Sequence, residues 1–393
     1  MRLLYVGRYQ FVRKTDGVYA LPAYGDHFWL KYLDVFDGVD VLGEDVKGYL
    51  NNGTLAKITD GRIRVEILPE NTNPKSFKND KEVKRLLKKY ISAADAILIK
   101  PACRKGMQAI EIAKKLNKPY MIEITGDLNL TLKNNGNPLK KLYGPIIHRQ
   151  ILHAIRDCKF GLYVSEKYLQ KVYPIAGEQC GCTDTVIPNP EETSLQNRMH
   201  KIDFLGEASA VKIGMVASYH DTRKGLDTAV KALALLSDSR IELHVLGLGT
   251  EEDRSKWFAF ARKYGIEKQL VFDSSKSSIQ DVLEWNDGMD VIILPSRSEG
   301  LPRCIVESIS RACPCILSNV CGMPELVNEH WLHKPRDEKK LASLLNEMIN
   351  DKEKMKKAAQ ENYEHSFYYT QGVLRTKRNA FLMKFKEYCE SKY

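Results

Sequence analysis

Two glutamates with seven residues between them, Glu299 and Glu307, are the side chains of this chain best suited to chemistry. The buried-type run Val291–Leu294 predicts a strand before them, and the apolar spacing after Pro302 predicts a helix with proline in its first turn. The open N–H groups and positive dipole at a helix start suit a phosphate. Carboxylates accept hydrogen bonds from sugar hydroxyls. The pattern therefore predicts a site for a sugar nucleotide.

A basic pair, Arg223-Lys224, stands between the predicted strand Lys212–Ala217 and the predicted helix Leu226–Leu236. The dipole at a helix start destabilises a cation by about 0.3–1 kcal/mol. An anion bound in front of the pair would make the position of the two cations favourable instead. The alternative is two surface bases on a loop. The conjunction with the glutamates favours the functional interpretation.

Two residues of the first half are further candidates. Gly17 lies in the loop expected after the first strand, where a glycine lets a diphosphate approach closely. Asp127 follows the predicted strand Tyr120–Ile124, so it lies at the carboxyl end of a parallel sheet, where ligands bind. Such an aspartate either forms a turn or binds an acceptor, and the sequence leaves both interpretations open.

Strands and helices alternate along the whole chain, as in parallel sheets with helices on both faces. We expect an α/β protein with two Rossmann-like, doubly wound domains that face each other across a cleft. The first domain is predicted at residues 1–195, with its last strand at Thr185–Ile187. A polar stretch predicts a linker at 196–210, and the second domain follows at 211–371.

The net charge of +10 comes from the first half of the chain. Residues 1–190 hold 30 Lys and Arg against 20 Asp and Glu, whereas residues 191–393 hold 30 of each. A basic surface suits an acidic partner. No basic-aromatic module for nucleic acid is present, so an anionic membrane surface is the better candidate. Nine cysteines without an export signal predict a cytoplasmic protein. Its basic surface would then make it peripheral on the inner face of the cell membrane.

One predicted helix in the first half is basic and amphipathic. Val83, Leu87 and Ile91 share one face, and the other face carries lysine and arginine, including Lys84 and Lys88. Such a helix can lie on anionic lipid. The alternative, which we favour, is a helix that packs on its sheet with a solvated charged face.

No metal site is expected. The chain contains no Asp-x-Asp triplet, the usual carboxylate device for holding a metal on a nucleotide diphosphate. Its close cysteine pairs, Cys180-Gly-Cys182 and Cys313-Pro-Cys315, lack the usual zinc spacing. The phosphate charge would then be met by Arg223, Lys224 and helix dipoles, without a cofactor.

With these motifs the second half resembles the family 4 (group 1) glycosyltransferases of the GT-B fold. The matching stretch, from about Lys212 to Leu326, holds Lys224-Gly225, the run Leu294–Pro302 with Glu307, and the turn Gly322–Leu326. Three stretches of the first half resemble members that build capsule or O-antigen polysaccharide: Asp95–Pro101, Pro119–Glu123 and Tyr163–Leu169.

The resemblance implies a role for each motif residue. Lys224 would hold the donor diphosphate, Glu307 would accept from the ribose hydroxyls, and Glu299 from the donor sugar. The family's arginine after the first strand of this domain is absent here, and Arg223 is the candidate to replace it. We assign catalysis to Glu299, Lys224 and Asp127, and donor binding to Glu307, Arg223, Gly300, Leu301, Pro302 and Gly17.

The function implied is a retaining, metal-independent transfer of a sugar from a nucleotide diphosphate, with UDP assumed, to a hydroxyl of a saccharide acceptor. The acceptor, expected to be lipid-linked and part of surface polysaccharide biosynthesis, would bind the first domain, and a C-terminal helix at 372–393 would cross back to it. The alternatives are a UDP-sugar epimerase of similar fold and a non-catalytic sugar-nucleotide-binding protein.

Overall fold

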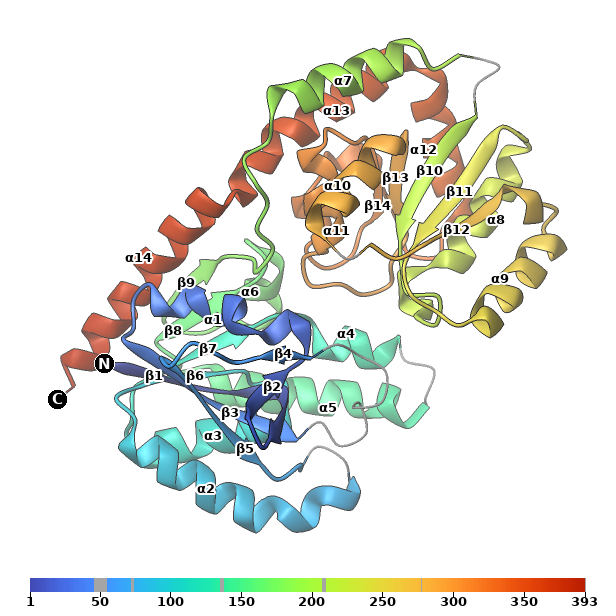
Figure 1. Ribbon diagram of the computed structural model, residues 1–393. Helices are drawn as coiled ribbons and strands as arrows, with labels where there is room; N and C mark the ends of the chain where they lie inside the picture. The colour runs from blue at the N-terminus through green and yellow to red at the C-terminus, as the bar shows by residue number, and fades with distance from the viewer. Residues whose placement is uncertain (46–54, 72–73, 135–137, 207–209, 277, 393) are drawn as a thin grey trace. The chain divides into compact units, whose positions relative to one another are not determined.

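The computed structural model describes residues 1–45, 55–71, 74–134, 138–206, 210–276 and 278–392 (Figure 1). The chain divides into two compact units. Unit 1 comprises Met1–Asn129, Tyr143–Cys182 and Arg375–Tyr393, and unit 2 comprises Leu130–Leu142 and Thr183–Leu374. Among the helices of the described residues, none has both the length and the hydropathy that a membrane span requires.

Unit 1 is built on a sheet with nine strands in the described residues. Its parallel part has the order β5-β3-β1-β6-β7-β8-β9. The short strand β2 pairs antiparallel with the C-terminal end of β1, and β4 pairs antiparallel with β2. The strands are β1 Arg2–Lys14, β2 Gly17–Ala20, β3 Gly38–Asp45, β4 Ala56–Lys57, β5 Ile63–Leu68, β6 Ala96–Ile99, β7 Tyr120–Ile124, β8 Phe160–Tyr163 and β9 Glu178–Gly181.

Helices cover both faces of the unit 1 sheet because side chains alternate along each strand. On one face, alternate strand residues such as Ile97 and Ile122 form a core with apolar residues of α2 (Asp80–Ala93), α3 (Arg104–Lys115) and α5 (Pro138–Ile155). On the other face, Tyr5 contacts Trp29 and Tyr32 of α1 (Asp26–Leu33). Two short helices follow β7 and β8: α4 (Leu128–Lys133), which belongs to unit 2 from Leu130 onward, and α6 (Tyr168–Val172).

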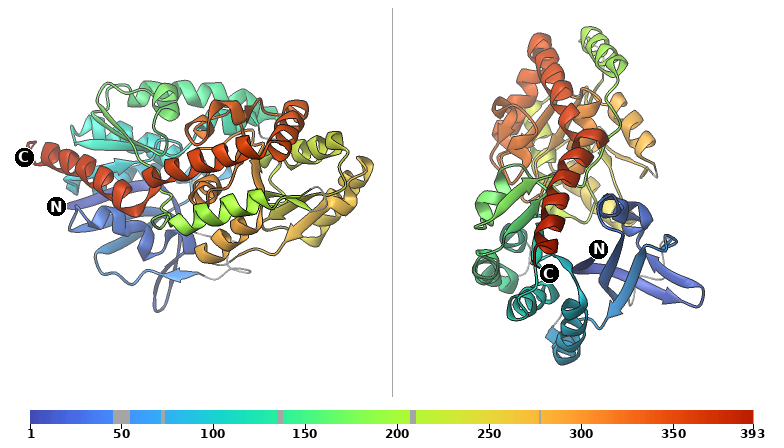
Figure 2. Two further views of the ribbon diagram at one scale, coloured as in Figure 1. Left: turned by 90° about the horizontal axis from the view of Figure 1, so that it is seen from above. Right: turned by 90° about the vertical axis from the view of Figure 1, so that its left-hand side faces the viewer.

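The C-terminal helix α14 (Gln371–Glu390) belongs to unit 1 from Arg375 onward. Figure 2 shows this helix, in red, from two further sides. Its Phe381 and Phe385 pack against Phe160 of β8, with ring centroids 5.8 and 5.5 Å apart. Arg375 donates two hydrogen bonds to the carboxylate of Asp34, of 2.8 and 2.7 Å. Aromatic packing and ion pairs therefore hold this helix on the sheet of unit 1.

Unit 2 contains a parallel sheet with the order β12-β11-β10-β13-β14-β15. Counted from its first strand, this order is 3-2-1-4-5-6, that of a doubly wound Rossmann sheet. The winding reverses between β10 and β13, which is where such sheets bind ligands. The strands are β10 Val211–Val216, β11 Ile241–Leu246, β12 Leu270–Asp273, β13 Val291–Leu294, β14 Cys315–Ser318 and β15 Leu332–His333.

The helices of unit 2 connect and cover these strands (Figure 1). They are α7 Glu192–Asp203, α8 Leu226–Leu236, α9 Glu251–Lys263, α10 Ile279–Gly288, α11 Arg303–Ser310, α12 Glu338–Asn350 and α13 Lys352–Ser366. The strands and helices predicted for this half agree with these elements to within a few residues, because their apolar periodicity is strong.

The predicted linker at 196–210 requires correction, since α7 occupies this stretch up to Asp203. Arg198 of α7 is 3% exposed and donates to the carbonyl groups of Asn286 (2.9 Å), Met289 and Arg311 (3.4 Å). This one guanidinium satisfies carbonyl groups at the ends of α10 and α11, which docks α7 on unit 2. A polar sequence thus conceals a helix that tertiary hydrogen bonds hold in place.

The boundary of the first domain also differs from the expected one. Unit 1 ends its central part at Cys182, and the predicted strand Thr185–Ile187 forms only a single bridge, between Ile187 and Thr370 of unit 2. The strands β2, β4 and β9 of unit 1 and β15 of unit 2 were not predicted. They are short, and two to four residues are too few for a period-two pattern to be distinguished.

Candidate active site

The candidate residues of unit 2 lie in the loops after the two strands where the sheet reverses its winding. Lys224 follows β10 within the 3-10 turn η3 (Thr222–Lys224), and Glu299 follows β13. Because β10 and β13 are hydrogen-bonded neighbours, their loops emerge side by side at the carboxyl edge of the sheet. The topology therefore brings together two residues that are far apart in the sequence.

Lys224 and Glu299 form an ion pair with 2.8 Å between Lys224 Nζ and Glu299 Oε1. Their side chains are 23% and 13% exposed. Ser296 donates a second hydrogen bond of 2.9 Å to the same carboxylate oxygen. Burial alone would lower the pKa of Lys224, but the Glu299 carboxylate, together with Cys304 and Asp221, outweighs it, and the pKa of Lys224 lies above its ordinary value. The ammonium group therefore stays charged at this site.

Gly225 allows the two loops to approach closely. Its φ is +79°, in the left-handed region, and a Cβ atom there would lie 2.1 Å from the carbonyl oxygen of Pro295. A side chain is excluded by both the conformation and the contact. The glycine in the Lys224-Gly225 pair is thus required by the packing of the Lys224 loop against the loop that carries Glu299.

Arg297 joins the same two loops. Its side chain is 10% exposed, donates to the carbonyl oxygen of Thr222 (2.6 Å) and forms an ion pair with Asp227 in the first turn of α8. Its backbone N–H donates to the carbonyl oxygen of Arg223 (2.7 Å). Arg297 therefore sets the position of the Lys224 loop relative to the Glu299 loop.

Arg223 lies in the same loop as Lys224 but is engaged elsewhere. Its guanidinium donates two hydrogen bonds to the Asp221 carboxylate, of 3.0 and 2.7 Å, and it is 40% exposed. The Asp221 contact raises the pKa of Arg223. An anion would have to be bound by the remaining N–H groups of Arg223, beside the carboxylate of Asp221.

Glu307 lies on α11, the helix that follows the motif, and is half-buried. Burial raises the pKa of its carboxyl, and the charge of Arg303 opposes this only in part. Within the described residues, no hydrogen bond or ion pair of this carboxylate is found. A partly buried carboxylate without a partner costs free energy, and hydroxyl donors from a ligand would reduce that cost.

The turn between the two glutamates is held by backbone contacts. Leu301 is 8% exposed, and Pro302 is the N-cap of α11 rather than a residue of its first turn. The Gly300 carbonyl oxygen accepts from the N–H of Gly322 (3.0 Å), and Cys321 Sγ accepts from the N–H of Glu299 (3.4 Å). The second turn, which begins at Gly322, thus supports the first.

The chain is similar to known glycosyltransferases. Residues 206–365 match the family described as "Glycosyl transferases group 1". Over 391 residues the chain is 27% identical to Protein CapJ of Staphylococcus aureus, covering 98% of this chain and 96% of that protein. The second half of the chain therefore matches the group 1 glycosyltransferases. The chain is also 26% identical over 198 residues to a lipopolysaccharide 1,6-galactosyltransferase of Escherichia coli, covering 47% of this chain and 50% of that protein.

The structure also resembles that of HepE from Anabaena, crystallised in complex with UDP-glucose. The TM-score is 0.62 at 16% identity, and the likeness covers 98% of this glycosyltransferase and 100% of the other chain. At this identity the likeness shows the fold alone. The glycosyltransferase therefore has the GT-B fold that the resemblance in sequence implied.

The two candidates of the first half lie in unit 1 of the glycosyltransferase. Gly17 starts β2, directly after the Thr15-Asp16 turn of a hairpin whose register pairs it with Lys14. Its φ is +148°, so the hairpin itself explains the glycine. β1 extends to Lys14 and carries this hairpin at its C-terminal end.

Asp127 lies after β7 and is 6% exposed. The hydroxyls of Tyr168 and Tyr173 donate to its carboxylate, at 2.9 and 3.4 Å, so it is a hydrogen-bonded acceptor within unit 1. Of the described residues, no group of three or more His, Cys, Asp or Glu side chains is arranged to hold a metal ion.

Sequence reasoning assigned no role to Arg297 or Asp227. In the sequence, Arg297 is a cation inside the motif, and Asp227 is an acid in the first turn of the predicted helix after Gly225. Nothing in the sequence indicates that they pair, since 70 residues separate them. A cation that follows a strand directly and precedes a motif glutamate is the signal that could have identified Arg297.

Proposed function

We propose that this glycosyltransferase moves a sugar from UDP to a hydroxyl of a saccharide acceptor, with retention of configuration and without a metal ion. The observation that carries the proposal is the Lys224–Glu299 pair at the switch point of unit 2. On the following helix, the carboxylate of Glu307 has no hydrogen bond or ion pair with any residue that the structure describes. The Lys224 cation would bind the diphosphate, and the two carboxylates would accept hydrogen bonds from the hydroxyls of the sugar and the ribose.

In the proposed reaction, Lys224 binds the diphosphate while it remains paired with Glu299. An ammonium group has three N–H donors, so one bond to Glu299 leaves donors for phosphate oxygens. The bond between the anomeric carbon and the β-phosphate oxygen breaks, and the acceptor oxygen bonds to the same face of the sugar. The acceptor proton moves to the departing phosphate oxygen. Lys224 stabilises the negative charge that builds on that oxygen.

Glu299 and Glu307 would orient the donor. The Glu299 carboxylate is held by Lys224 and Ser296 and would accept from hydroxyls of the transferred sugar. Glu307 would accept from the ribose hydroxyls, which supply the donors that its half-buried carboxylate lacks. Asp127, with Tyr168 and Tyr173, is the proposed contact for the acceptor, and Gly17 and Arg223 are secondary candidates for the donor.

The relatives suggest the substrates. HepE binds UDP-glucose in its crystal structure, and the galactosyltransferase of Escherichia coli acts on lipopolysaccharide. We therefore propose a UDP-sugar donor and a lipid-linked saccharide acceptor in the biosynthesis of a capsule or lipopolysaccharide. An acceptor with a lipid tail would place the enzyme on the inner face of the cell membrane.

The deciding experiment measures UDP release from a panel of UDP-sugars, with and without a lipid-linked saccharide acceptor, in buffer that contains EDTA. We expect release that depends on acceptor and persists in EDTA. NMR of the product should show the anomeric configuration of the donor. Acceptor-independent conversion of the UDP-sugar into its epimer would instead indicate an epimerase, and loss of turnover in EDTA would contradict the metal-independent mechanism.

A further inference from the structure

His244 lies between two carboxylates in the sheet of unit 2. It belongs to β11 and is 9% exposed. Its Nδ1 atom lies 3.2 Å from a carboxylate oxygen of Asp273, and its Nε2 atom lies 3.0 Å from one of Glu242. An ionised carboxylate only accepts hydrogen bonds, so both bonds form only when both ring nitrogens carry a proton. The geometry therefore requires the charged imidazolium form of His244.

The strand register explains why these side chains meet. Glu242 and His244 are two residues apart on β11, so their side chains lie on the same face of the sheet. Asp273 shares this face, because it lies two residues beyond the partner of His244 on β12. On the other side of β11, Gly214 of β10 pairs with His244. α10 covers the face with Trp285, which lies against Gly214 and donates to the Asp273 carboxylate at 2.7 Å.

The ionisable groups around His244 favour its charged form. The bond to Asp273 raises the pKa of His244, burial opposes this rise, and the bond to Glu242 adds to it. Burial raises the pKa of Asp273, but the bonds from His244 and Trp285 outweigh burial. With the added charge of Lys276, which follows β12, the pKa of Asp273 lies below its ordinary value. Both partners are therefore ionised near neutral pH.

Loss of the imidazolium proton weakens the contact with Asp273, whichever nitrogen loses it. A neutral imidazole keeps one N–H group, so one of the two carboxylates then faces a lone pair. If the remaining N–H group faces Asp273, that bond still loses the attraction between opposite charges, which is large for a partly buried pair. His244 therefore holds Asp273 most firmly while the ring is charged.

Asp273 in turn holds the loop that follows β10. Its carbonyl oxygen accepts from the hydroxyl of Tyr219 at 3.1 Å, and the Tyr219 ring lies 4.5 Å from that of Phe272. The backbone N–H of Tyr219 donates to the carbonyl oxygen of Leu248 (2.9 Å). The carbonyl oxygen of Tyr219 accepts from Trp257 Nε1 of α9 (2.8 Å). Tyr219 is 2% exposed, and these contacts fix it against β12, α9 and the loop after β11.

Tyr219 is the anchor from which the chain reaches Lys224. The N–H of Asp221 donates to the carbonyl oxygen of Ser218 (3.0 Å), and the N–H of Lys224 donates to that of Asp221 (3.2 Å). Two consecutive hydrogen-bonded turns thus connect the anchor to the lysine. A shift of Tyr219 would move both turns and, with them, the ammonium group that faces Glu299.

We propose that His244 is a positioning residue of the donor site: its imidazolium ion holds Asp273, which holds Tyr219 and thereby the loop that carries Lys224. The inference rests on the function proposed above, in which Lys224 binds the diphosphate of the donor. Its consequence is a diphosphate affinity that decreases as the pH rises and His244 loses its proton. A histidine that served stability alone would leave the affinity of the folded protein unchanged.

The test is calorimetric titration of the full chain with UDP between about pH 6 and pH 9. His244→Gln removes the ionisable ring. At the acidic end we expect its dissociation constant to exceed that of the wild type about threefold or more, a change that the weakening of one hydrogen bond can supply. The ratio of the two constants should fall toward one as the pH rises, because the wild-type ring becomes neutral.

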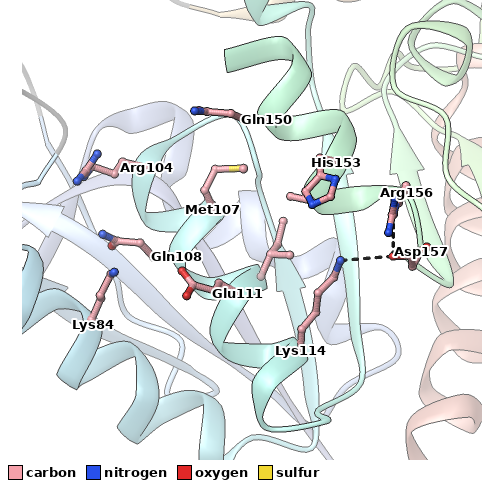
Figure 3. Close-up of a pocket in the computed structure, with 12 residues that line it drawn as sticks. Lys84, Arg104, Met107, Gln108, Glu111, Lys114, Gln150, His153, Arg156 and Asp157 are labelled. Carbon is pink, nitrogen blue, oxygen red and sulfur yellow. Dashed lines mark hydrogen bonds and ion pairs between the residues drawn. The ribbon is translucent and has the colours of Figure 1, made fainter. Parts of the chain in front are cut away.

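His153→Gln is the matched control. His153 is an exposed histidine of α5 in unit 1, where it lines a groove of about 480 Å³ (Figure 3). Its removal should leave the dissociation constant for UDP equal to that of the wild type at every pH. A ratio for His244→Gln that stays at one, or that does not change with pH, would overturn the proposal.

Hydrogen exchange without UDP separates this inference from the assignment of the donor. At about pH 6, His244→Gln and Tyr219→Phe should each accelerate exchange in residues 218–225 about threefold or more, since each removes a bond that holds the loop. Unchanged exchange in both variants would refute the positioning role. Accelerated exchange in a chain that does not bind UDP would support the role of His244 and contradict UDP as part of the donor. Thermal unfolding checks that the variants fold.

Discussion

Lys224 Nζ lies 2.8 Å from Glu299 Oε1, although 75 residues separate the two in the chain. Each residue follows one of two neighbouring strands, β10 and β13, so the pair bridges the point where the sheet reverses its winding. The phosphate-binding cation and the sugar-binding carboxylate of the proposed site are therefore one electrostatic unit. Each holds the other in position before any substrate binds.

Lys224→Ala should lower kcat/KM at least about a hundredfold, the usual loss for a group that stabilises charge in a transition state. Glu299→Gln should cause a similar loss, and the double variant should lose far less than the product of the two because the groups act together. Steady-state UDP release measures all three. Lys256→Ala removes an exposed lysine paired with Glu252 at 2.7 Å and should leave the rate unchanged. Near-normal turnover of Lys224→Ala would count against the assignment.

Arg297→Lys should lower kcat/KM about tenfold or more, although the charge is kept. A lysine cannot donate to both the Thr222 carbonyl and the Asp227 carboxylate in the geometry of a guanidinium, so the Lys224 loop would lose its position. Since Arg297 positions the donor site, the KM for the UDP-sugar should rise while the KM for the acceptor stays unchanged. Arg262→Lys, at an exposed pair with Glu267, is the matched control. An unchanged donor KM in Arg297→Lys would refute the positioning role.

Glu307→Gln should raise the thermal midpoint at neutral pH while it weakens donor binding. The folded state holds the pKa of Glu307 above its ordinary value, so ionisation of this carboxyl destabilises the fold at a pH above both its unfolded and its folded pKa. The stability difference between variant and wild type should shrink as pH falls through the raised pKa, where wild-type Glu307 becomes protonated. Thermal unfolding between about pH 5 and pH 8, with and without UDP, measures both effects. A midpoint below wild type at neutral pH would contradict this account.

Arg198→Met should destabilise the protein by about 2–4 kcal/mol, because it leaves several buried carbonyl groups without a donor. The guanidinium is 3% exposed and binds carbonyl oxygens at the ends of α10 and α11. Urea unfolding followed by circular dichroism measures the loss. Arg240→Met, which removes a half-exposed pair with Asp238, should cost less than about 1 kcal/mol. Equal losses in the two variants would mean that α7 is not anchored through Arg198.

Much of unit 2 could be predicted from the sequence. Its strands are short runs of buried apolar residues, and the helices between them have strong apolar periodicity, so local patterns suffice. The boundary near residue 196 could not be predicted in the same way. α7 has a polar sequence, and what stabilises it is a set of contacts from Arg198 and Lys201 to groups about ninety residues away.

By itself, the sequence determined the α/β class, the doubly wound pattern of unit 2 and the motif residues Lys224, Glu299 and Glu307. These follow from local periodicity and from spacing along the chain. Only the tertiary structure decided the partners: Lys224 with Glu299, Arg223 with Asp221, and Arg297 with Asp227. It also decided that the apolar face of α2 is buried. Hydrogen bonds and burial depend on residues brought together from distant parts of the chain, and no local pattern specifies them.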